Sequence, residues 1–488
     1  MTYLKIFISS VCFILVSTLI ISCNNDEFII DNSISSIHVS TGETYPAFNP
    51  EVKDYYINSL NTLNEIAITI DNFDTKKNIY INNIKATSNI TNIKLNIGDD
   101  IVIKSFNENN EPIIYTIHYL PSDLPKTNVI TKNNPSEGFI FINLFHLSPS
   151  NPNPTNYIAI LNNDGFPVYY KKTTNQIINF KYFETSTNQK RYSYNDNTLG
   201  KIIVMDENFN ELNQLELLPN NGHGAIRTDN HDFIYFNDNH YILPAYVSRT
   251  GVNMTAYGGA SSVELLDFAF QEILNGQVIF EWNSANFTEF LQHTDPIYYN
   301  QFATNPKVDY FHFNSIAIDP NDNNFIVSAR HMNQVYKINR STGQIMWRFG
   351  GSNDDFNLIG NTIISHPHHA TILANGNLLL FDNGVTKTPQ QSRIVEFDIN
   401  EDNFTSTIVN QYTETGRYFD IMGSAQKLQN GNYFIGWGGN ITSQVNANKS
   451  DITEVDASGN ILLDISFSNN PNSFTYSYRA LKYNISFQ

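Results

Sequence analysis

Cysteine is almost absent from this chain of 488 residues. The only two cysteines, Cys12 and Cys23, both lie near the N-terminus. The sequence after Cys23 therefore contains no sulfur that could form a disulfide or a cysteine-based metal site. The folded part of the chain must draw its stability from a hydrophobic core.

Charged residues are also few, and basic residues are the scarcer kind. Asp, Glu, Lys and Arg make up 16% of the sequence, and 29 basic against 47 acidic residues give a formal net charge of -18. Nucleic-acid binding needs a basic face, so this balance argues against a nucleic-acid partner. A small anion can bind such a chain only in a pocket whose local charge is positive.

Aromatic and strand-forming residues, in contrast, are plentiful. Aromatic residues reach 13%, and Asn, Thr and Ile recur along the whole chain. β-branched and aromatic residues favour strands, whereas Asn favours the turns between them. The composition therefore predicts an all-β protein of many short strands.

The N-terminus has the features of an export signal. Lys5 is the only basic residue before the apolar run 6–21, and Ser22 then precedes Cys23. A short apolar segment that ends in small residues before a Cys is typical of secretion rather than of a spanning helix. The Ile-Ile-Ser-Cys ending resembles a bacterial lipobox. It implies a signal peptide over 1–22 and a lipid on Cys23 that anchors the protein to the cell envelope, at its periplasmic face or cell surface. An ordinary signal peptide and an uncleaved membrane anchor are the alternatives.

Residues 33–120 predict a small all-β module. Apolar residues alternate with polar ones in short runs such as 34–39 and 66–70, with Gly, Asn and Asp between the runs. The stretch 39–56 resembles the opening of the bacterial cadherin-like β-sandwich family, which implies a spacer or docking module. The proline-containing stretch 121–136 predicts a linker.

A four-strand pattern recurs from residue 137 to residue 488. A turn of Asn, Gly or Asp precedes a short apolar strand, and a second turn precedes the closing strand. The opening elements stand at 237–243, 321–327, 375–381 and 430–435. Four strands per unit, repeated about every 55 residues, are typical of propeller blades, and two weaker units precede these four. The sequence thus predicts a β-propeller of about six blades after a small β-sandwich. A β-solenoid or two sandwiches are the alternatives.

Histidine is sparse, with 12 in the chain, yet it recurs at one place in this pattern. His231, His312 and the segment 366–369 each precede the turn and strand of a unit. Because the innermost strand of each blade lines the propeller axis, residues at equivalent positions on different blades converge. The repeat therefore predicts a histidine-lined site at the axis.

A metal site is an alternative interpretation of the histidine-rich segment 366–369. Successive strand residues point to opposite faces, so His368 and His369 cannot both face one ion unless the strand is irregular. The segment also contains no carboxylate. We therefore expect neither a metal nor another cofactor.

Several motifs in these units resemble the bacterial arylsulfotransferase family. They are His312-Phe-Asn314-Ser, Ser-Ala-Arg330-His, Pro-His368-His369-Ala, Phe-Asp-Asn-Gly and Gly-Trp-Gly. The resemblance covers about residues 222–483 and is most specific from His312 to Asn383. It implies a six-bladed propeller preceded by a β-sandwich. It also implies transfer of a sulfuryl group from an aryl sulfate donor to a phenolic acceptor, without a nucleotide sulfate donor, through a sulfated histidine.

The family's nucleophilic histidine falls within the Pro-His-His-Ala segment. Alignment on Ala370 and on the Asn375-Gly376 turn selects His368, and a shift by one residue selects His369. A neutral imidazole is a competent nucleophile near neutral pH, and its adduct stays reactive enough to pass the group on.

The resemblance also implies the supporting residues. The family's arginine falls on Arg330, whose planar fork can hold two sulfate oxygens. Its H-x-N-S pair falls on His312 and Asn314, which can donate hydrogen bonds where negative charge concentrates. An earlier helper histidine falls on His231, so His231 or His312 can protonate the departing phenolate. The chain lacks the disulfide of better-studied members, and its first units match poorly.

Two function classes follow from these observations. The first is an aryl-sulfate sulfotransferase attached to a membrane through its N-terminal lipid, with a homodimer as a further possibility. The second is a non-catalytic surface propeller that binds glycan or protein. The set of His312, Asn314, Arg330 and His368 favours the enzyme, because a pure scaffold has no need of it.

The lipid on Cys23 can be tested directly. Wild-type protein should incorporate labelled fatty acid and partition with membranes. Cys23→Ala should leave the protein unlabelled, and either released or unprocessed. A wild-type protein that never takes up label would contradict the lipoprotein hypothesis.

Overall fold

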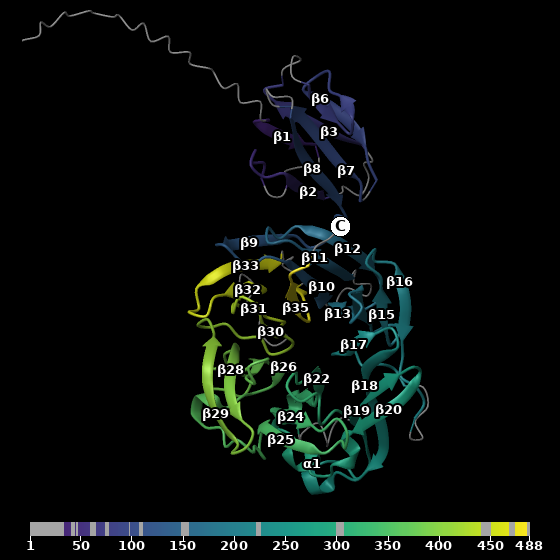
Figure 1. Cartoon of the computed structure of the whole chain (residues 1–488), viewed down its shortest axis with the longest axis vertical. Helices are drawn as coiled ribbons and strands as arrows, with labels where there is room; N and C mark the ends of the chain where they lie inside the picture. Colours follow the sequence, from purple (N-terminus) through teal and green to yellow (C-terminus); the bar gives the residue numbers. More distant parts are fainter. Residues whose placement is uncertain are drawn as a thin grey trace, which may run out of the picture. The chain divides into compact units, whose positions relative to one another are not determined.

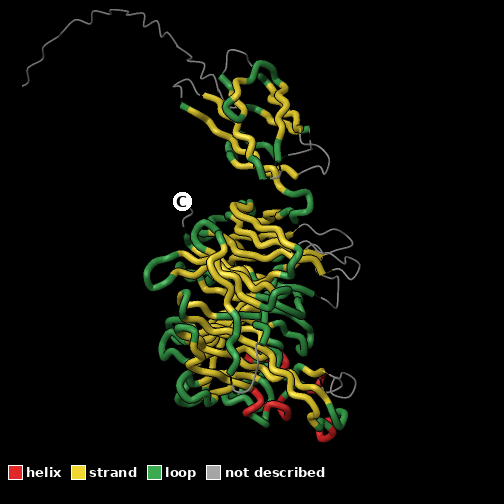
Figure 2. Tube along the Cα trace, turned by 90° about the vertical axis from the view of Figure 1, so that its right-hand side faces the viewer, coloured by secondary structure: helices red, strands yellow, loops and turns green. Residues whose placement is uncertain are grey.

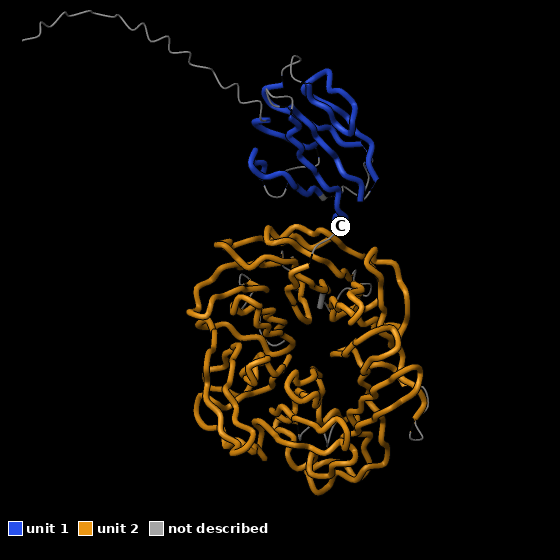
Figure 3. Tube along the Cα trace, in the orientation of Figure 1, with its two compact units in different colours: residues 1–122 blue, residues 123–488 orange. Residues whose placement is uncertain are grey.

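The computed structural model places most of the chain in two units, residues 1–122 and 123–488 (Figure 3). It describes residues 34–485 except 41–43, 45–46, 59–64, 74–77, 97, 107–110, 148–155, 221–225, 299–306, 441–449 and 468–473. The predicted signal peptide 1–22 and Cys23 lie outside the described residues. Among the residues described, no helix has both the length and the apolar content needed to span a bilayer.

The first unit is a β-sandwich. One sheet has the order β1-β3-β6, with bounds Ser36–Val39, Glu65–Asp71 and Ile90–Lys94. The other has the order β2-β8-β7-β4-β5, with bounds Asp54–Asn58, Pro112–Leu120, Asp100–Phe106, Tyr80–Ile81 and Ile84–Lys85. Alternate residues of both sheets, such as Ile68 and Ile103, are fully buried in one shared core. The predicted sandwich is confirmed, and its membership of the cadherin-like family stays a prediction.

The second unit is a ring of six sheets, the blades of a propeller (Figure 1). Blade 1 contains β10 (Phe139–Leu147), β11 (Asn156–Leu161) and β12 (Pro167–Thr173), and blade 2 contains β13 (Ile177–Glu184), β14 (Lys190–Asp196), β15 (Lys201–Met205) and β16 (Glu211–Leu215). Blade 3 contains β17 (Ile234–Asn237), β18 (His240–Val252), β19 (Val263–Leu274) and β20 (Gln277–Asn283), and the short β21 (Lys307–Val308) pairs with β19.

The remaining blades repeat the same antiparallel order. Blade 4 contains β22 (Phe313–Ile318), β23 (Phe325–Ala329), β24 (Gln334–Ile338) and β25 (Ile345–Gly350). Blade 5 contains β26 (Pro367–Ile372), β27 (Leu378–Asp382), β28 (Arg393–Asn400) and β29 (Thr405–Tyr412), and blade 6 contains β30 (Ser424–Lys427), β31 (Tyr433–Gly436), β32 (Ile452–Val455) and β33 (Ile461–Phe467). Helical segments are few and short, such as α1 (Phe290–His293) (Figure 2). The predicted all-β propeller is confirmed.

Both ends of the propeller chain close the ring. From the C-terminal end, β34 (Phe474–Tyr476) and β35 (Ala480–Tyr483) pair with β10 and supply the inner edge of blade 1. From the N-terminal end, β9 (Thr127–Lys132) pairs with β33 and becomes the outermost strand of blade 6. This pairing corrects the prediction that 121–136 is only a linker. The segment Thr-Asn-Val-Ile-Thr-Lys forms a strand because the edge of β33 is free to pair with it, and its residues alternate between more and less buried positions.

A buried ion pair fixes this closure at the axis. Arg479, just before β35, has Nη1 2.8 Å from Oδ1 of Asp232 in blade 3, and its Nη2 donates to the carbonyl oxygen of Asn314 in blade 4 at 2.7 Å. The Nζ of Lys181 in blade 2 also contacts Asp232. All four residues are buried. The closing strand is therefore tied to three other blades as well as to its own.

Asp232→Asn should destabilise the propeller strongly. Arg479 and Lys181 hold the pKa of Asp232 far below its usual range despite burial, so its charge is present at neutral pH. Its loss leaves two buried cations without a counter-charge, which costs about 3–5 kcal/mol. Urea unfolding should show the difference. As the matched control, Asp164→Asn removes an exposed partner of Lys132 and should cost less than about 1 kcal/mol. Equal losses in the two variants would contradict this role.

Candidate active site

Four of the predicted residues meet near the axis, where the innermost strands of blades 3, 4 and 5 begin. His231 precedes β17, His312 precedes β22 and His368 lies at the start of β26. Arg330 lies in the short helix η4 (Arg330–Met332) after β23, and its backbone N–H donates to the carbonyl oxygen of His312 at 2.8 Å. The His231 and His312 rings lie 5.1 Å apart, centre to centre. Their side chains remain 21% and 25% exposed, so a ligand can reach them.

His368 is buried and held in one tautomer. Its Nδ1 lies 2.6 Å from Oδ1 of Asn383. The Asn383 amide nitrogen donates to the carbonyl oxygens of Phe419 and Met422, which fixes its oxygen toward the imidazole. Nδ1 of His368 therefore carries the proton, and Nε2 carries the free lone pair. Burial, followed by the charge of Arg330, holds the pKa of His368 well below 6.5, so the ring is neutral at pH 7.

His369 belongs to different surroundings. Its Nδ1 lies 2.8 Å from the carbonyl oxygen of Ala425. The charges acting on its pKa come from Arg479, Asp232 and Lys181, whereas those acting on His368 come from Arg330, His312 and His231. A break in register between His368 and Thr371 accompanies this change of direction. The two histidines therefore face separate clusters and do not share one ion.

Arg330 is a cation held by neutral groups. Its Nη1 donates to the Tyr298 hydroxyl at 2.7 Å, and its Nη2 donates to the carbonyl oxygen of Asp420 at 2.9 Å. Its Nε is buried without a hydrogen-bond partner. Within the described ranges no carboxylate forms an ion pair with it. An incoming anion would supply both the missing acceptor and the missing charge.

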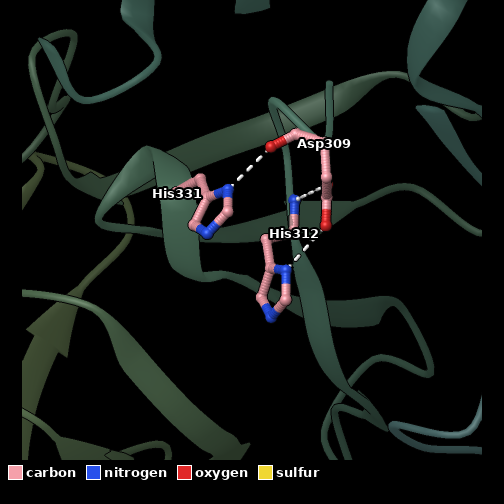
Figure 4. A group of neighbouring side chains, drawn as sticks. All are labelled: Asp309, His312 and His331. Carbon is pink, nitrogen blue, oxygen red and sulfur yellow. Dashed lines mark hydrogen bonds and ion pairs between the residues drawn. The ribbon is translucent and has the colours of Figure 1, made fainter. Parts of the chain in front are cut away.

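His312 and His331 form a stacked pair beside Asp309 (Figure 4). Nδ1 of His312 lies 2.6 Å from the Asp309 carboxylate, and Nδ1 of His331 lies 2.7 Å from the Asp309 carbonyl oxygen. Burial lowers the pKa of His312 despite the Asp309 charge, and it lowers the pKa of His331 further. The three residues bring metal-ligand atoms within 4.8 Å of one another. The rings, however, lie 4.4 Å apart at 22°, so their nitrogens do not converge on one point.

His231 has the opposite protonation tendency. Its Nδ1 lies 2.8 Å from Oδ1 of Asp229. Burial lowers the pKa of His231, but the Asp229 charge and hydrogen bond outweigh burial, so the net shift is upward from 6.5. The site thus contains one histidine that tends to hold a proton and several that stay neutral.

Asn314 occupies a different place from the one expected. Its amide nitrogen donates to the carbonyl oxygen of Pro367 at 2.6 Å, and the Ser328 hydroxyl donates to the same oxygen. This contact holds β26 immediately before His368. Asn314 therefore fits a positioning residue better than a donor to the anion, although its Oδ1 is buried without a partner.

Several residues of the site were not singled out from the sequence. They are Asp229, Tyr298, Asp309 and Asn383, whereas His366 was noted only as part of the histidine-rich segment. The spacings Asp229-x-His231 and Asp309-x-x-His312 are a local signal for the two Asp–His pairs. Tyr298 gives no such signal, because it reaches Arg330 and Nε2 of His366 from a distant turn.

Comparisons with solved structures give several likenesses at low identity. The chain is similar to a protein of unknown function from Bacteroides caccae, with 14% identity, 70% of this chain and 98% of that chain covered, and a TM-score of 0.41. It is also similar to virginiamycin B lyase from Staphylococcus aureus, with 12% identity, coverage of 70% and 88%, and a TM-score of 0.33. A third likeness is to the β-propeller domain of Cps50 (Swd1) from Myceliophteria thermophila, with 8% identity, coverage of 71% and 90%, and a TM-score of 0.34.

No curated protein matches the chain. The model of the arylsulfotransferase (ASST) family, however, matches residues 227–479, more than half of the sequence. The match includes His231, His312, Arg330 and His368. The chain therefore belongs to the arylsulfotransferase family.

Proposed function

We propose that this protein transfers a sulfuryl group from an aryl sulfate to a phenol through a sulfated His368, without a nucleotide donor. The observation that carries the proposal is the fixed tautomer of His368. Asn383 holds Nδ1–H, so Nε2 keeps its lone pair, and the positive charge of Arg330 acts on this ring. The family assignment supports aryl sulfotransfer in general. The histidine intermediate is the finer step that the geometry favours.

In the first half-reaction, Nε2 of His368 attacks the sulfur of the donor. The N–S bond forms, and the S–O bond to the aryl group breaks. The phenolate leaves with the electron pair and takes a proton from His231. The imidazole ring becomes positively charged, and the Asn383 oxygen stabilises that charge through the Nδ1–H hydrogen bond.

In the second half-reaction, the acceptor phenol attacks the same sulfur. His312, neutral and held by Asp309, takes the phenol proton as the S–O bond forms. The N–S bond breaks and returns the electron pair to Nε2. Arg330 stabilises the transition state of both steps. Its free Nε–H and its positive charge act on the sulfuryl oxygens as they become more negative, in a site of low dielectric.

A non-catalytic propeller that binds glycan or protein is the other candidate. Such a scaffold gains nothing from a partly buried arginine without a carboxylate partner or from two Asp–His pairs. These features involve desolvation and leave a donor unsatisfied, so they favour a reactive anion site. We also propose that the lipid on Cys23 keeps this site at the cell envelope.

His368→Asn should lower turnover on the order of 10³-fold or more, while His369→Asn should lower it less than about tenfold. Of these two histidines, His368 is the one whose pKa the Arg330 charge lowers, and in the proposed mechanism its Nε2 forms the adduct. Initial rates at varied donor and acceptor should give the parallel lines of a ping-pong scheme. Intact mass after mixing with donor alone should show one added sulfuryl group.

Thermal unfolding is the control, because both variants must fold for the comparison to count. An adduct on Tyr or Ser would contradict the histidine intermediate. Transfer without any adduct would contradict it equally. If His369 is essential and His368 dispensable, the nucleophile is the neighbouring residue.

The two half-reactions should respond to pH in opposite directions. The pKa of His231 is raised above 6.5, so its proton is present at pH 6.5 and is lost as the pH rises further. Single-turnover release of a weakly acidic phenol should therefore slow at alkaline pH. The pKa of His312 lies below 6.5, so the acceptor step should slow only as acid protonates this base. His231→Gln should flatten the alkaline limb alone. An unchanged limb in that variant would assign the acid to another group.

A further inference from the structure

A second cavity opens on the same propeller axis. It has a volume of about 420 Å³ and is lined by the innermost strands of all six blades. Representative lining residues are Lys181, Phe236, Ala317, Thr371, Gln426 and Leu481. None of the residues to which the proposed function assigns a chemical step lines it.

This cavity lies at a different level from the candidate active site. Phe236, Ala317 and Thr371 lie on β17, β22 and β26, three to five residues after His231, His312 and His368 in the sequence. The lining begins at Asp232 and His369, which directly follow His231 and His368, and it continues along the strands away from those two histidines. Arg479 pairs with Asp232 of the cavity lining and donates to the carbonyl oxygen of Asn314 at 2.7 Å, and the Asn314 amide donates to Pro367 beside His368. The cavity is therefore a separate place for a ligand.

Lys181 and Asp232 line the cavity, and the buried Arg479 outside the lining pairs with the same Asp232, so this cluster has one more positive than negative charge. Lys181 and Arg479 share a single carboxylate, that of Asp232, and no second carboxylate forms an ion pair with either in the described part of the chain. The Asp232 oxygens also accept the backbone N–H groups of Phe233 at 2.9 Å and Ile316 at 3.0 Å. Lys181 lies over the Phe233 ring and donates to its carbonyl oxygen at 3.1 Å. Its third N–H is left for a ligand.

Aromatic side chains make up much of the remaining wall. Phe183 and Phe236 are only partly buried and line the cavity, and Phe183 packs against Phe233 with ring centres 5.7 Å apart. An apolar wall favours a ring, whereas an incompletely paired ammonium favours an anion. Burial also lowers the pKa of Lys181 to about 8, as expected for a cation that is not fully compensated.

We propose that this axial cavity binds an aromatic monoanion, a carboxylate or a sulfate, with its charge on Lys181 and its ring against Phe183 and Phe236. This site goes beyond the proposed function, since it uses no residue of the sulfuryl-transfer step. Aryl carboxylates and aryl sulfates share the chemistry that the cavity recognises, so the test compares both.

Calorimetric titration of the full-length protein with 2-naphthoate tests the proposal, because this anion cannot donate a sulfuryl group. Wild-type protein should bind one equivalent. Lys181→Met should weaken binding about tenfold or more, since it removes a charge-assisted hydrogen bond but leaves Asp232 paired with Arg479. Lys172→Met, on the exposed face of β12, is the matched control and should bind like wild type. Neutral 2-naphthalenemethanol should bind wild type and Lys181→Met equally.

Two further variants separate the cavity from the active site. Ala317→Trp should block binding without removing charge, which keeps the test decisive if Lys181→Met fails to fold. Arg330→Met should leave 2-naphthoate affinity unchanged, and in this variant 2-naphthyl sulfate shows which anion the cavity prefers. Unchanged affinity in both Lys181→Met and Ala317→Trp would overturn the proposal. Loss of 2-naphthoate binding in Arg330→Met would also overturn it and place the ligand in the active site, while leaving the sulfuryl-transfer mechanism intact.

Discussion

The ion pair between Arg479 and Asp232 is the contact on which the centre of the propeller depends. A ring of sheets must be closed, and here Arg479, the residue before the closing strand β35, pairs with Asp232 in blade 3. Arg479 also holds the carbonyl oxygen of Asn314. The Asn314 amide in turn holds the carbonyl oxygen of Pro367, next to His368. The same hydrogen-bond network therefore closes the ring and positions the candidate nucleophile.

Three histidines near the propeller axis have strained backbone conformations. His312, His366 and His369 have φ of +50°, +56° and +46°, a region that non-glycine residues seldom occupy. Such conformations persist where surrounding contacts determine them. Asp309 binds both the backbone N–H and Nδ1 of His312, and the Asn333 side chain accepts the backbone N–H of His366. A regular strand would already point His368 and His369 to opposite faces, and the positive φ of His369 adds a break in register directly after His368.

The repeat of turns and short strands made the blades predictable, because each Asn–Gly turn precedes a strand that must pair locally. The convergence of His231, His312 and His368 followed from their equivalent places in the blades. Local spacing could not reveal β9, whose pairing partner β33 lies more than 300 residues away in sequence. The contact of Asn314 with Pro367 could not be predicted either, because it depends on how blades 4 and 5 pack.

The net charge of -18 does not conflict with anion binding at the axis. Exposed charges are screened over about 8–10 Å in physiological salt, whereas buried charges act through a medium of low dielectric. Arg330 is held by a hydroxyl and a carbonyl oxygen, and Lys181 and Arg479 share one carboxylate. In the described part of the chain Arg330 thus has no paired carboxylate, and the cluster around Asp232 has one more positive than negative charge. The acidic exterior sets the long-range field, but these local surpluses decide what the interior can hold.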